Sequence, residues 1–276
     1  MRFYKMEGLG NDFIVTHEIS EYNIELIKNQ AITLCDRRKG IGADGVICVL
    51  PSSASDFKMR IFNSDGSEAE MCGNGIRCFA LYTKLLNLTK LNQLSIDTPA
   101  GVISTELLDN SLVKVKMSNP ILNGPEIPVA VSSGKVLMKD LVIGDKTFKI
   151  NAVSMGNPHA VIYVDDTISD ELVLGYGPKI ETHPFFPKKT NVEFIKVLSQ
   201  KEIQMRVWER GCGETQACGT GACASVVSGI INRLHGNCVT VHLPGGELDI
   251  EWSGKETDPV FMTGPAKKVF EGIVEL

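Results

Sequence analysis

The chain has 276 residues, of which 43% are hydrophobic and 22% charged, and its formal net charge is −5 with a pI near 5.6. This length suffices for two domains, and the composition is typical of a soluble globular protein. The acidic balance argues against a nucleic-acid partner or an anionic membrane surface, and no stretch is apolar enough to span a bilayer.

In chain order, the first predicted element after a short strand is a helix over residues 23–36, where Ile24, Ile27 and Ala31 recur at helical spacing. Alternating or continuous apolar residues, bounded by Gly, Asn and Ser, predict the strands of the first half. These strands are residues 13–15, 46–50, 57–62, 94–98 and 112–117.

The second half repeats this order of elements. Pro120 lies in a proline-punctuated connector, which places the boundary near residues 118–120. The predicted strands of the second half are residues 159–164, 192–197, 203–208, 239–243 and 248–252.

Each half also contains one helix that is apolar on nearly all sides. Residues 218–232 carry no charge, and residues 78–88 carry only Lys84. A helix of this kind is buried. We therefore predict an α/β (α+β) fold of two pseudo-symmetric halves, each a curved, mostly antiparallel sheet wrapped around a central buried helix.

The two helices follow matching cysteine motifs. Cys72 and Cys218 each precede a Gly-x-Gly sequence, and they are 146 residues apart. The same separation relates Met59 to Met205 and Gly10 to Gly156. This constant offset indicates an internal duplication with two cysteines in equivalent settings.

A helix that begins at each cysteine would offer free N–H groups to an anion and would lower the pKa of the thiol. Two such thiols suit proton removal from one face of an amino-acid α-carbon and delivery to the other. Cys72 and Cys218 are therefore the predicted acid and base, and no pyridoxal cofactor is needed.

Amide and charged side chains occupy matching loop edges around these motifs. Arg210 is suited to clamp a carboxylate, Glu209 to receive an ammonium group, and His159 to tune a nearby thiol. The matching amides are Asn11, Asn63, Asn157 and Asn191.

The remaining cysteines are expected to be packing residues. Cys35, Cys48 and Cys238 lie in apolar or strand-like contexts, and Cys78 and Cys223 fall within the two buried helices. No Cys-x-x-Cys pair occurs, which disfavours a thiol-redox or metal-binding protein. A Cys–His hydrolase built with His159 would leave the duplication unexplained.

Seven segments in order resemble the diaminopimelate epimerase family. They are residues 8–13, 62–67, 71–77, 156–159, 190–194, 208–211 and 217–222. The resemblance implies a cofactor-independent isomerase, without a metal, that interconverts LL- and meso-2,6-diaminopimelate in lysine and peptidoglycan precursor synthesis. For the LL substrate, Cys218 would accept the proton and Cys72 would donate one.

The resemblance also implies the organisation of the chain. Residues 1–118 would form the N-terminal half, joined by a C-terminal strand at 264–276, and residues 119–263 would form the C-terminal half. The active site would lie in the cleft between the halves. Because no secretion signal is recognisable, we expect a cytoplasmic protein, and the resemblance implies a homodimer.

His159 and Glu209 would tune the cysteine pKa values, as the resemblance implies. Many members carry a substrate-contacting Gln where this chain has Gly45, and Cys212 is an unusual third thiol to which we assign no catalytic part. The implied substrate contacts are Asn11, Asn63, Gly73, Asn74, Asn157, Asn191, Glu209, Arg210, Gly219 and Thr220.

A close alternative is another two-cysteine racemase of the same fold, of the proline-racemase type. The phenazine-biosynthesis isomerases of this fold lack the cysteine pair. The adjacent Glu209 and Arg210, together with the asparagine set, favour a substrate that carries a second amino-acid head group.

Overall fold

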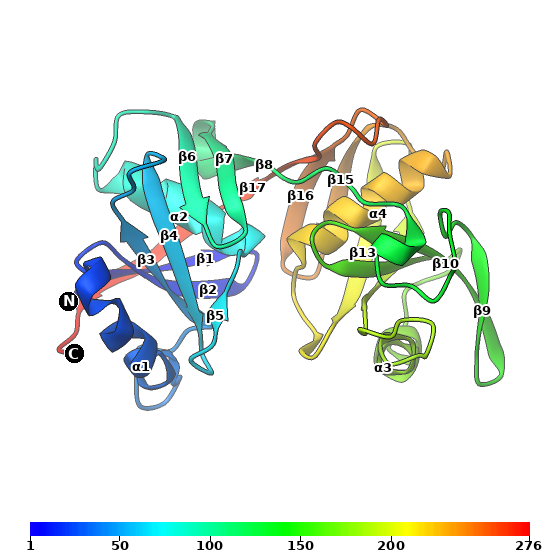
Figure 1. The fold of residues 1–276 in the computed structure, drawn as a ribbon, viewed down its shortest axis with the longest axis horizontal. Coiled ribbons are helices and arrows are strands. Elements are labelled where there is room, and N and C mark those ends of the chain that lie inside the picture. The colour runs from blue at the N-terminus through cyan, green and yellow to red at the C-terminus, as the bar shows by residue number, and fades with distance from the viewer. The chain divides into compact units, whose positions relative to one another are not determined.

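The chain divides into two compact units in a computed structural model that describes residues 1–276. Unit 1 comprises Met1–Lys116 and Thr263–Leu276, and unit 2 comprises Met117–Met262. Each unit places a mostly antiparallel sheet around one buried helix, so the predicted α+β fold class is confirmed (Figure 1).

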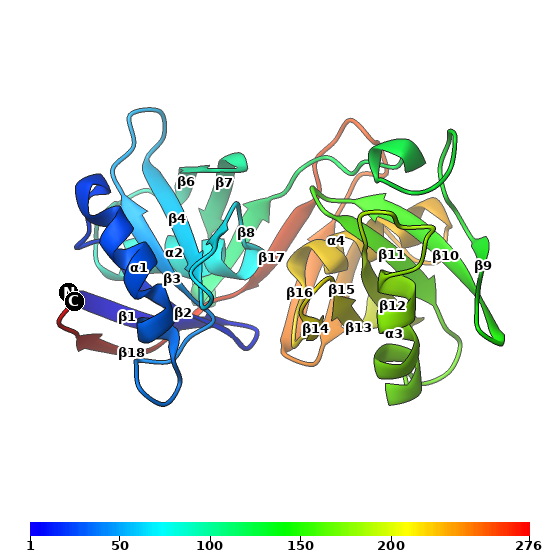
Figure 2. The ribbon, with the colours of Figure 1, turned by 60° about the horizontal axis from the view of Figure 1, so that its bottom comes forward.

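In unit 1 the central helix is α2 (Gly73–Leu85), which packs against β1, β2, β7 and β8. The second helix, α1 (Ile24–Cys35), packs on β3 and β4 (Figure 2). The strands of unit 1 are β1 (Arg2–Gly8), β2 (Asn11–Thr16), β3 (Gly45–Leu50), β4 (Phe57–Asn63), β5 (Glu68–Ala69), β6 (Gln93–Thr98), β7 (Gly101–Leu107), β8 (Leu112–Lys116) and β18 (Lys267–Ile273); β17 (Phe261–Pro265) enters this unit from unit 2.

The two helices of unit 1 use opposite faces of β3, because successive strand residues point to opposite sides. Val46 and Cys48 belong to the apolar cluster that covers α1. Ile47 points the other way, and its Cδ1 lies 3.1 Å from an ideal Cβ placed on Gly75 of α2. All six residues of β3 are consequently buried.

Unit 2 repeats the arrangement around α4 (Gly219–Ile231), which packs against β10, β11, β12 and β16. A π-helical segment, Glu171–Tyr176, leads into α3 (Gly177–Glu181). The strands of unit 2 are β9 (Lys139–Ile143), β10 (Lys146–Ser154), β11 (Pro158–Tyr163), β12 (Asn191–Val197), β13 (Glu202–Glu209), β14 (Gly213–Glu214), β15 (Cys238–Leu243) and β16 (Gly246–Glu251).

Strand register confirms the duplication. The parallel pair β2–β3 places Phe13 opposite Gly45, and the parallel pair β11–β12 places His159 opposite Asn191. Both residues of the second pair lie 146 positions beyond their counterparts, and α2 and α4 begin at the same offset with 13 residues each. The repeated sequence therefore builds the same local backbone twice.

Two parts of the fold were missing from the sequence prediction. The helical segment from Glu171 to Glu181 is the repeat of α1, but Gly175, Gly177 and Pro178 interrupt its helical pattern. The strands β1, β5, β7, β9, β10, β14 and β17 were not predicted either. In β7 and β9 some apolar residues are exposed, such as Val102 and Val142, so the apolar positions do not mark a single buried face.

Both ends of the chain lie in unit 1. Strand β18 pairs antiparallel with β1 (Figure 2), and the two chain ends lie together. The Met1 ammonium group donates to the Val274 carbonyl at 2.6 Å. No helix of the chain is both long and apolar enough to cross a membrane.

Candidate active site

The two matching cysteines occupy the N-cap positions of the two central helices. Cys72 has extended backbone angles, and its Sγ accepts the Gly75 N–H at 3.4 Å. Cys218 is also extended, and its Sγ lies 3.5 Å from Thr220 Oγ1. Each sulfur therefore lies at the positive end of a helix dipole, as the Gly-x-Gly motifs predicted.

On the Cys72 side, an asparagine amide connects the thiol to a carboxylate. Asn11 Oδ1 lies 3.6 Å from Cys72 Sγ and accepts Asn74 Nδ2 at 3.3 Å. Asn11 Nδ2 donates to Asp44 Oδ2 at 2.6 Å. Because Asp44 takes the amide nitrogen, the amide oxygen must face the thiol. Sequence reasoning missed Asp44, although it immediately precedes the noted Gly45.

A group of charged side chains surrounds Asp12, which follows Asn11 in the chain, and Asp44, which binds the Asn11 amide. Asp12 is bound by Lys5 at 2.7 Å and by both Nη atoms of Arg37 at 3.0 and 2.7 Å, while Arg37 also reaches Asp44 at 2.8 Å. Burial raises the pKa of Asp12, but the hydrogen bonds from Arg37 and Lys5 outweigh it and lower the pKa to about 2. We refer to Lys5, Asp12, Arg37 and Asp44 as the ionic network.

On the Cys218 side, the thiol is buried with 6% of its surface exposed. Burial raises the pKa of Cys218 well above its ordinary value, and the carboxylate of Glu209 raises it further. The helix start does lower the pKa of Cys218 through the Gly221 N–H, as predicted, but the net shift is upward. Loss of solvation and the nearby Glu209 carboxylate outweigh the helix dipole.

A buried pair lies beside Cys218. His159 Nδ1 is 2.7 Å from Glu193 Oε1, and both side chains are fully buried. His159 Nε2 is 3.0 Å from Asn157 Oδ1. Burial raises the pKa of Glu193, although His159 partly opposes that shift. Glu193 was absent from the predicted site, yet it is the only charged residue in the apolar run 192–195.

The predicted contacts at 191, 209 and 210 meet at the ends of β12 and β13. Asn191 Oδ1 accepts the Arg210 N–H at 2.9 Å, and Asn191 Nδ2 donates to the Pro158 carbonyl at 2.9 Å. The Arg210 side chain is exposed, while Glu209 accepts the Thr215 hydroxyl. Asn191 thus ties the start of β12 to the loop that carries Arg210.

In unit 1 the corresponding strand ends carry Gly45 and Asn63. These two residues are paired across β3 and β4, and Asn63 Nδ2 donates to Ser67 Oγ at 3.0 Å. An ideal Cβ placed on Gly45 would lie 2.8 Å from the Phe62 carbonyl oxygen. The close approach of this carbonyl explains why glycine stands here, and unit 1 therefore lacks the amide that Asn191 supplies in unit 2.

The remaining cysteines mostly follow the prediction. Cys35, Cys48, Cys78 and Cys223 are buried, and burial raises the pKa of Cys35 to about 11. Burial raises the pKa values of Cys48 and Cys78 to about 12. Such thiols are inert packing groups.

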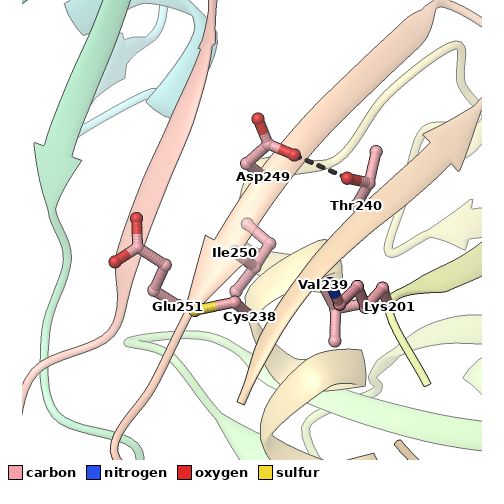
Figure 3. A pocket seen from close by; sticks show the side chains of 7 residues that line it. All are labelled: Lys201, Cys238, Val239, Thr240, Asp249, Ile250 and Glu251. Atoms are coloured by element: carbon pink, nitrogen blue, oxygen red, sulfur yellow. Dashed lines mark hydrogen bonds between the residues drawn. The ribbon is translucent and has the colours of Figure 1, made fainter. Parts of the chain in front are cut away.

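Cys238 is exposed, so its predicted core position is wrong. It begins β15, where Val239 and Val241 face the core and the alternate residues face outward. Cys238 lines a surface hollow of about 280 Å³ over β15 and β16, together with Lys201, Asp249 and Glu251 (Figure 3). None of the predicted site residues borders this hollow.

Comparisons with known proteins connect these features to a family. A family model described as diaminopimelate epimerase matches residues 3–122 and 151–269. The chain is 53% identical over 280 residues to the diaminopimelate epimerase of Halothermothrix orenii, covering 99% of this chain and 97% of that one. It is 54% identical over 276 residues to that of Carboxydothermus hydrogenoformans, covering 99% and 98%.

Solved structures share the fold at low sequence identity. A phenazine biosynthesis protein of the PhzF family from Bacillus anthracis matches with a TM-score of 0.69 and 16% identity, covering 100% of this chain and 99% of that one. A hydroxyproline epimerase from Agrobacterium vitis matches with a TM-score of 0.68 and 14% identity, covering 99% and 91%.

Proposed function

The chain belongs to the diaminopimelate epimerase family, and we propose that it interconverts LL- and meso-2,6-diaminopimelate without a cofactor. The observation that carries the proposal is the pair of cysteines, Cys72 and Cys218, at the N-caps of two equivalent buried helices. Membership of an epimerase family explains why the duplication preserves a thiol in each half.

In the LL direction, Cys218 acts as the thiolate base. The α C–H bond breaks, an S–H bond forms on Cys218, and the electron pair spreads onto the substrate carboxylate. Cys72 then gives its S–H proton to the opposite face of the α-carbon and is left as a thiolate. The reverse reaction exchanges these roles, and the proposal requires both thiols to reach one α-carbon.

The helix starts supply what the charged intermediate needs. The first residues of α2 and α4, including Gly73, Asn74, Gly219 and Thr220, offer main-chain N–H groups that α-helices leave unpaired. Each donor aimed at the enediolate oxygens is worth roughly 3–4 kcal/mol, by analogy with oxyanion holes. The carboxylate on the reacting carbon is therefore assigned to these helix ends.

The surroundings of each sulfur support the assigned roles. Asn11 Oδ1 faces Cys72 Sγ at 3.6 Å, and an acceptor there favours the S–H form that a proton donor requires. Cys218 must ionise beside Glu209, whose carboxylate raises the pKa of this thiol. A substrate ammonium group near Glu209 would offset that charge and lower the pKa of Cys218.

The second amino-acid head group of the substrate explains the remaining polar residues. The Arg210 main chain is held by Asn191, and its exposed guanidinium, which donates to the Lys188 carbonyl at 3.3 Å, can also bind a distal carboxylate. Asn63 and Asn157 are assigned as further contacts to this end of the substrate, and His159 as a group that tunes Cys218.

We also assign the enzyme to lysine and peptidoglycan precursor synthesis in the cytoplasm, as a homodimer. The net charge of −5 agrees with a protein that binds a small zwitterion rather than nucleic acid. Sedimentation at several protein concentrations measures the oligomeric state, and a monomer at micromolar concentration would contradict the dimer.

The test is epimerisation of LL-diaminopimelate in D₂O without pyridoxal phosphate, followed by the α-hydrogen NMR signal. We expect deuterium to enter the α-position as the meso isomer appears. Cys72→Ala and Cys218→Ala should each lower kcat/KM by about 10²–10⁴-fold, the usual contribution of a positioned acid or base. Cys238→Ala removes an exposed thiol remote from the predicted site residues and should leave the rate unchanged.

Proline and hydroxyproline serve as comparison substrates in the same assay. Turnover of proline but not of diaminopimelate would replace the proposal with a racemase of the proline type. Normal turnover by Cys72→Ala would contradict the two-base mechanism whichever substrate is used.

A further inference from the structure

Glu193 is a fully buried glutamate of β12 that lies beside the start of α4. Its Oε1 is 2.7 Å from His159 Nδ1, and its Oε2 has no hydrogen-bond partner. An ideal Cβ placed on Gly221 would lie 2.7 Å from Glu193 Oε1 and 3.3 Å from Cys218 Cβ. The carboxyl group and the cysteine therefore flank the same glycine.

The surroundings of Glu193 disfavour a carboxylate. His159 of β11 is its only side-chain hydrogen-bond partner, and the other ionisable groups that face it are Glu209 of β13 and Cys218 of α4. Neither of these brings a positive charge. A buried carboxylate with one unpaired oxygen is costly, whereas a neutral carboxylic acid leaves only an unpaired carbonyl oxygen.

For a neutral imidazole, the hydrogen bonds of His159 require the same protonation state. Asn157 Oδ1 can only accept, so His159 Nε2, at 3.0 Å, must carry a hydrogen. A neutral imidazole has one N–H group, so Nδ1 is then an acceptor. Glu193 can satisfy that acceptor only with an O–H group.

We propose that Glu193 is a positioning residue of the epimerase, which acts as a neutral acid that donates its proton to His159 Nδ1. His159 then donates Nε2–H to Asn157 Oδ1, and Asn157 Nδ2 remains available to donate to a ligand carboxylate. Cys218 ionises beside an uncharged pair instead of a second carboxylate. The functional part of this relay depends on the proposed reaction, but its protonation pattern does not.

The equivalent position in unit 1 shows that the pair is not a requirement of the fold. At the 146-residue offset, Ile47 stands where unit 2 has Glu193, and Phe13 stands where unit 2 has His159. Apolar residues therefore fill this space in the repeat, and the polar relay is specific to the Cys218 side.

The experiment is nitrogen NMR of the full-length protein with labelled histidine rings, with His159→Gln identifying the signal among five histidines. At neutral pH we expect His159 to carry hydrogen on Nε2 alone. Glu193→Gln should keep this tautomer, because the amide N–H also donates to Nδ1. Glu193→Leu should lose the preference, since leucine is similar in size but has no donor.

Glu202→Gln is the matched control, because Glu202 is exposed on β13 and lies 3.7 Å from His242 Nε2. It should shift only the His242 signal. A His159 ring protonated on Nδ1 alone, or on both nitrogens, would overturn the proposal. If Glu193→Leu does not fold, the wild-type and Glu193→Gln spectra still decide the tautomer.

Kinetics provide the second measurement. Glu193→Leu should lower kcat/KM by about tenfold, the equivalent of one buried hydrogen bond, and Glu193→Gln should restore it to within about threefold of wild type. Equal losses in both variants would contradict the relay. Absence of epimerisation in the wild type would reject the proposed function, while the NMR result on the tautomer would still stand.

Discussion

The surroundings of Cys72 and Cys218 differ although their backbones are duplicates. On the Cys72 side, the ionic network next to Asn11 is partly exposed, and 59% of the Arg37 side chain is accessible to solvent. On the Cys218 side, the pair next to Asn157, His159 and Glu193, is fully buried. Duplication has therefore preserved the thiol and the helix start while the supporting chemistry changed.

The two equivalent asparagines consequently use opposite ends of their amides. Asp44 takes the nitrogen of Asn11, which leaves the Asn11 oxygen toward Cys72. His159 takes the oxygen of Asn157, which leaves its nitrogen available. The same residue type therefore has a different hydrogen-bonding environment in each unit.

Replacing the second glycine of each Cys-Gly-x-Gly motif by alanine should have the largest effect on the difference between the two sides. In Gly221→Ala the new Cβ would lie 2.7 Å from Glu193 Oε1 and 3.1 Å from Met205 Cε, and we expect the free energy of unfolding to fall by about 1–3 kcal/mol. In Gly75→Ala the nearest atom is the mobile Ile47 Cδ1 at 3.1 Å, and the gain of about 1 kcal/mol from replacing helical glycine should offset the crowding.

Urea unfolding of the two variants measures this difference. The Gly221→Ala protein should also lose the His159 tautomer preference, because the carboxyl group must move. Equal destabilisation of the two variants would show that the buried pair places no special demand on Gly221.

The ionic network predicts an acid-sensitive contribution to stability. The pKa of Asp12 is about 2 in the folded protein against an ordinary 3.8, so its stabilising effect is fully present above pH 4 and is lost as the pH falls toward 2. Asp12→Asn should therefore lower the free energy of unfolding by about 2 kcal/mol at pH 7 and by little near pH 2.

Asp140→Asn is the matched control for Asp12→Asn. Asp140 pairs with Lys149, and both side chains are more than half exposed, so its loss should change stability negligibly. Chemical unfolding across the pH range checks both variants. A constant difference between wild type and Asp12→Asn from pH 7 to pH 2 would contradict the depressed pKa.

The smallest expected effect concerns the amide that faces Cys72. Asp44→Ala releases Asn11 Nδ2, so the amide can turn, and kcat/KM should fall about tenfold for the loss of one charge-assisted hydrogen bond. The alkylation rate of Cys72 should change while that of Cys218 stays the same. Peptide mass spectrometry resolves the two thiols, and equal changes at both would show that the sides are not independent.

The fold and the cysteine motifs could be predicted because their signals are local. Both central helices are uninterrupted apolar stretches that begin beside Cys72 and Cys218, and the constant offset requires no tertiary information. The alternation around Cys238 was also present in the sequence, with Val239 and Val241 as the inward residues. The outward position of Cys238 could therefore have been predicted from this alternation.

Asp44 and Glu193 could not be assigned in the same way, because their roles depend on strand pairing. Asp44 reaches Asn11 across β2 and β3, and Glu193 reaches His159 across β11 and β12, with more than 30 residues between partners. The raised pKa of Cys218 likewise depends on burial and on the neighbouring Glu209 carboxylate. Sequence shows the helix dipole but not the solvation that outweighs it.

The pairing of β1 with β18 has a consequence for how the protein is made. Residues 117–262 of unit 2 are contiguous and are translated before Thr263–Leu276. Unit 1 receives its last strand only from those final residues, so the half whose synthesis starts first is the half that is completed last. A premature stop codon near the end would therefore remove a strand of unit 1 and leave all residues of unit 2 in place.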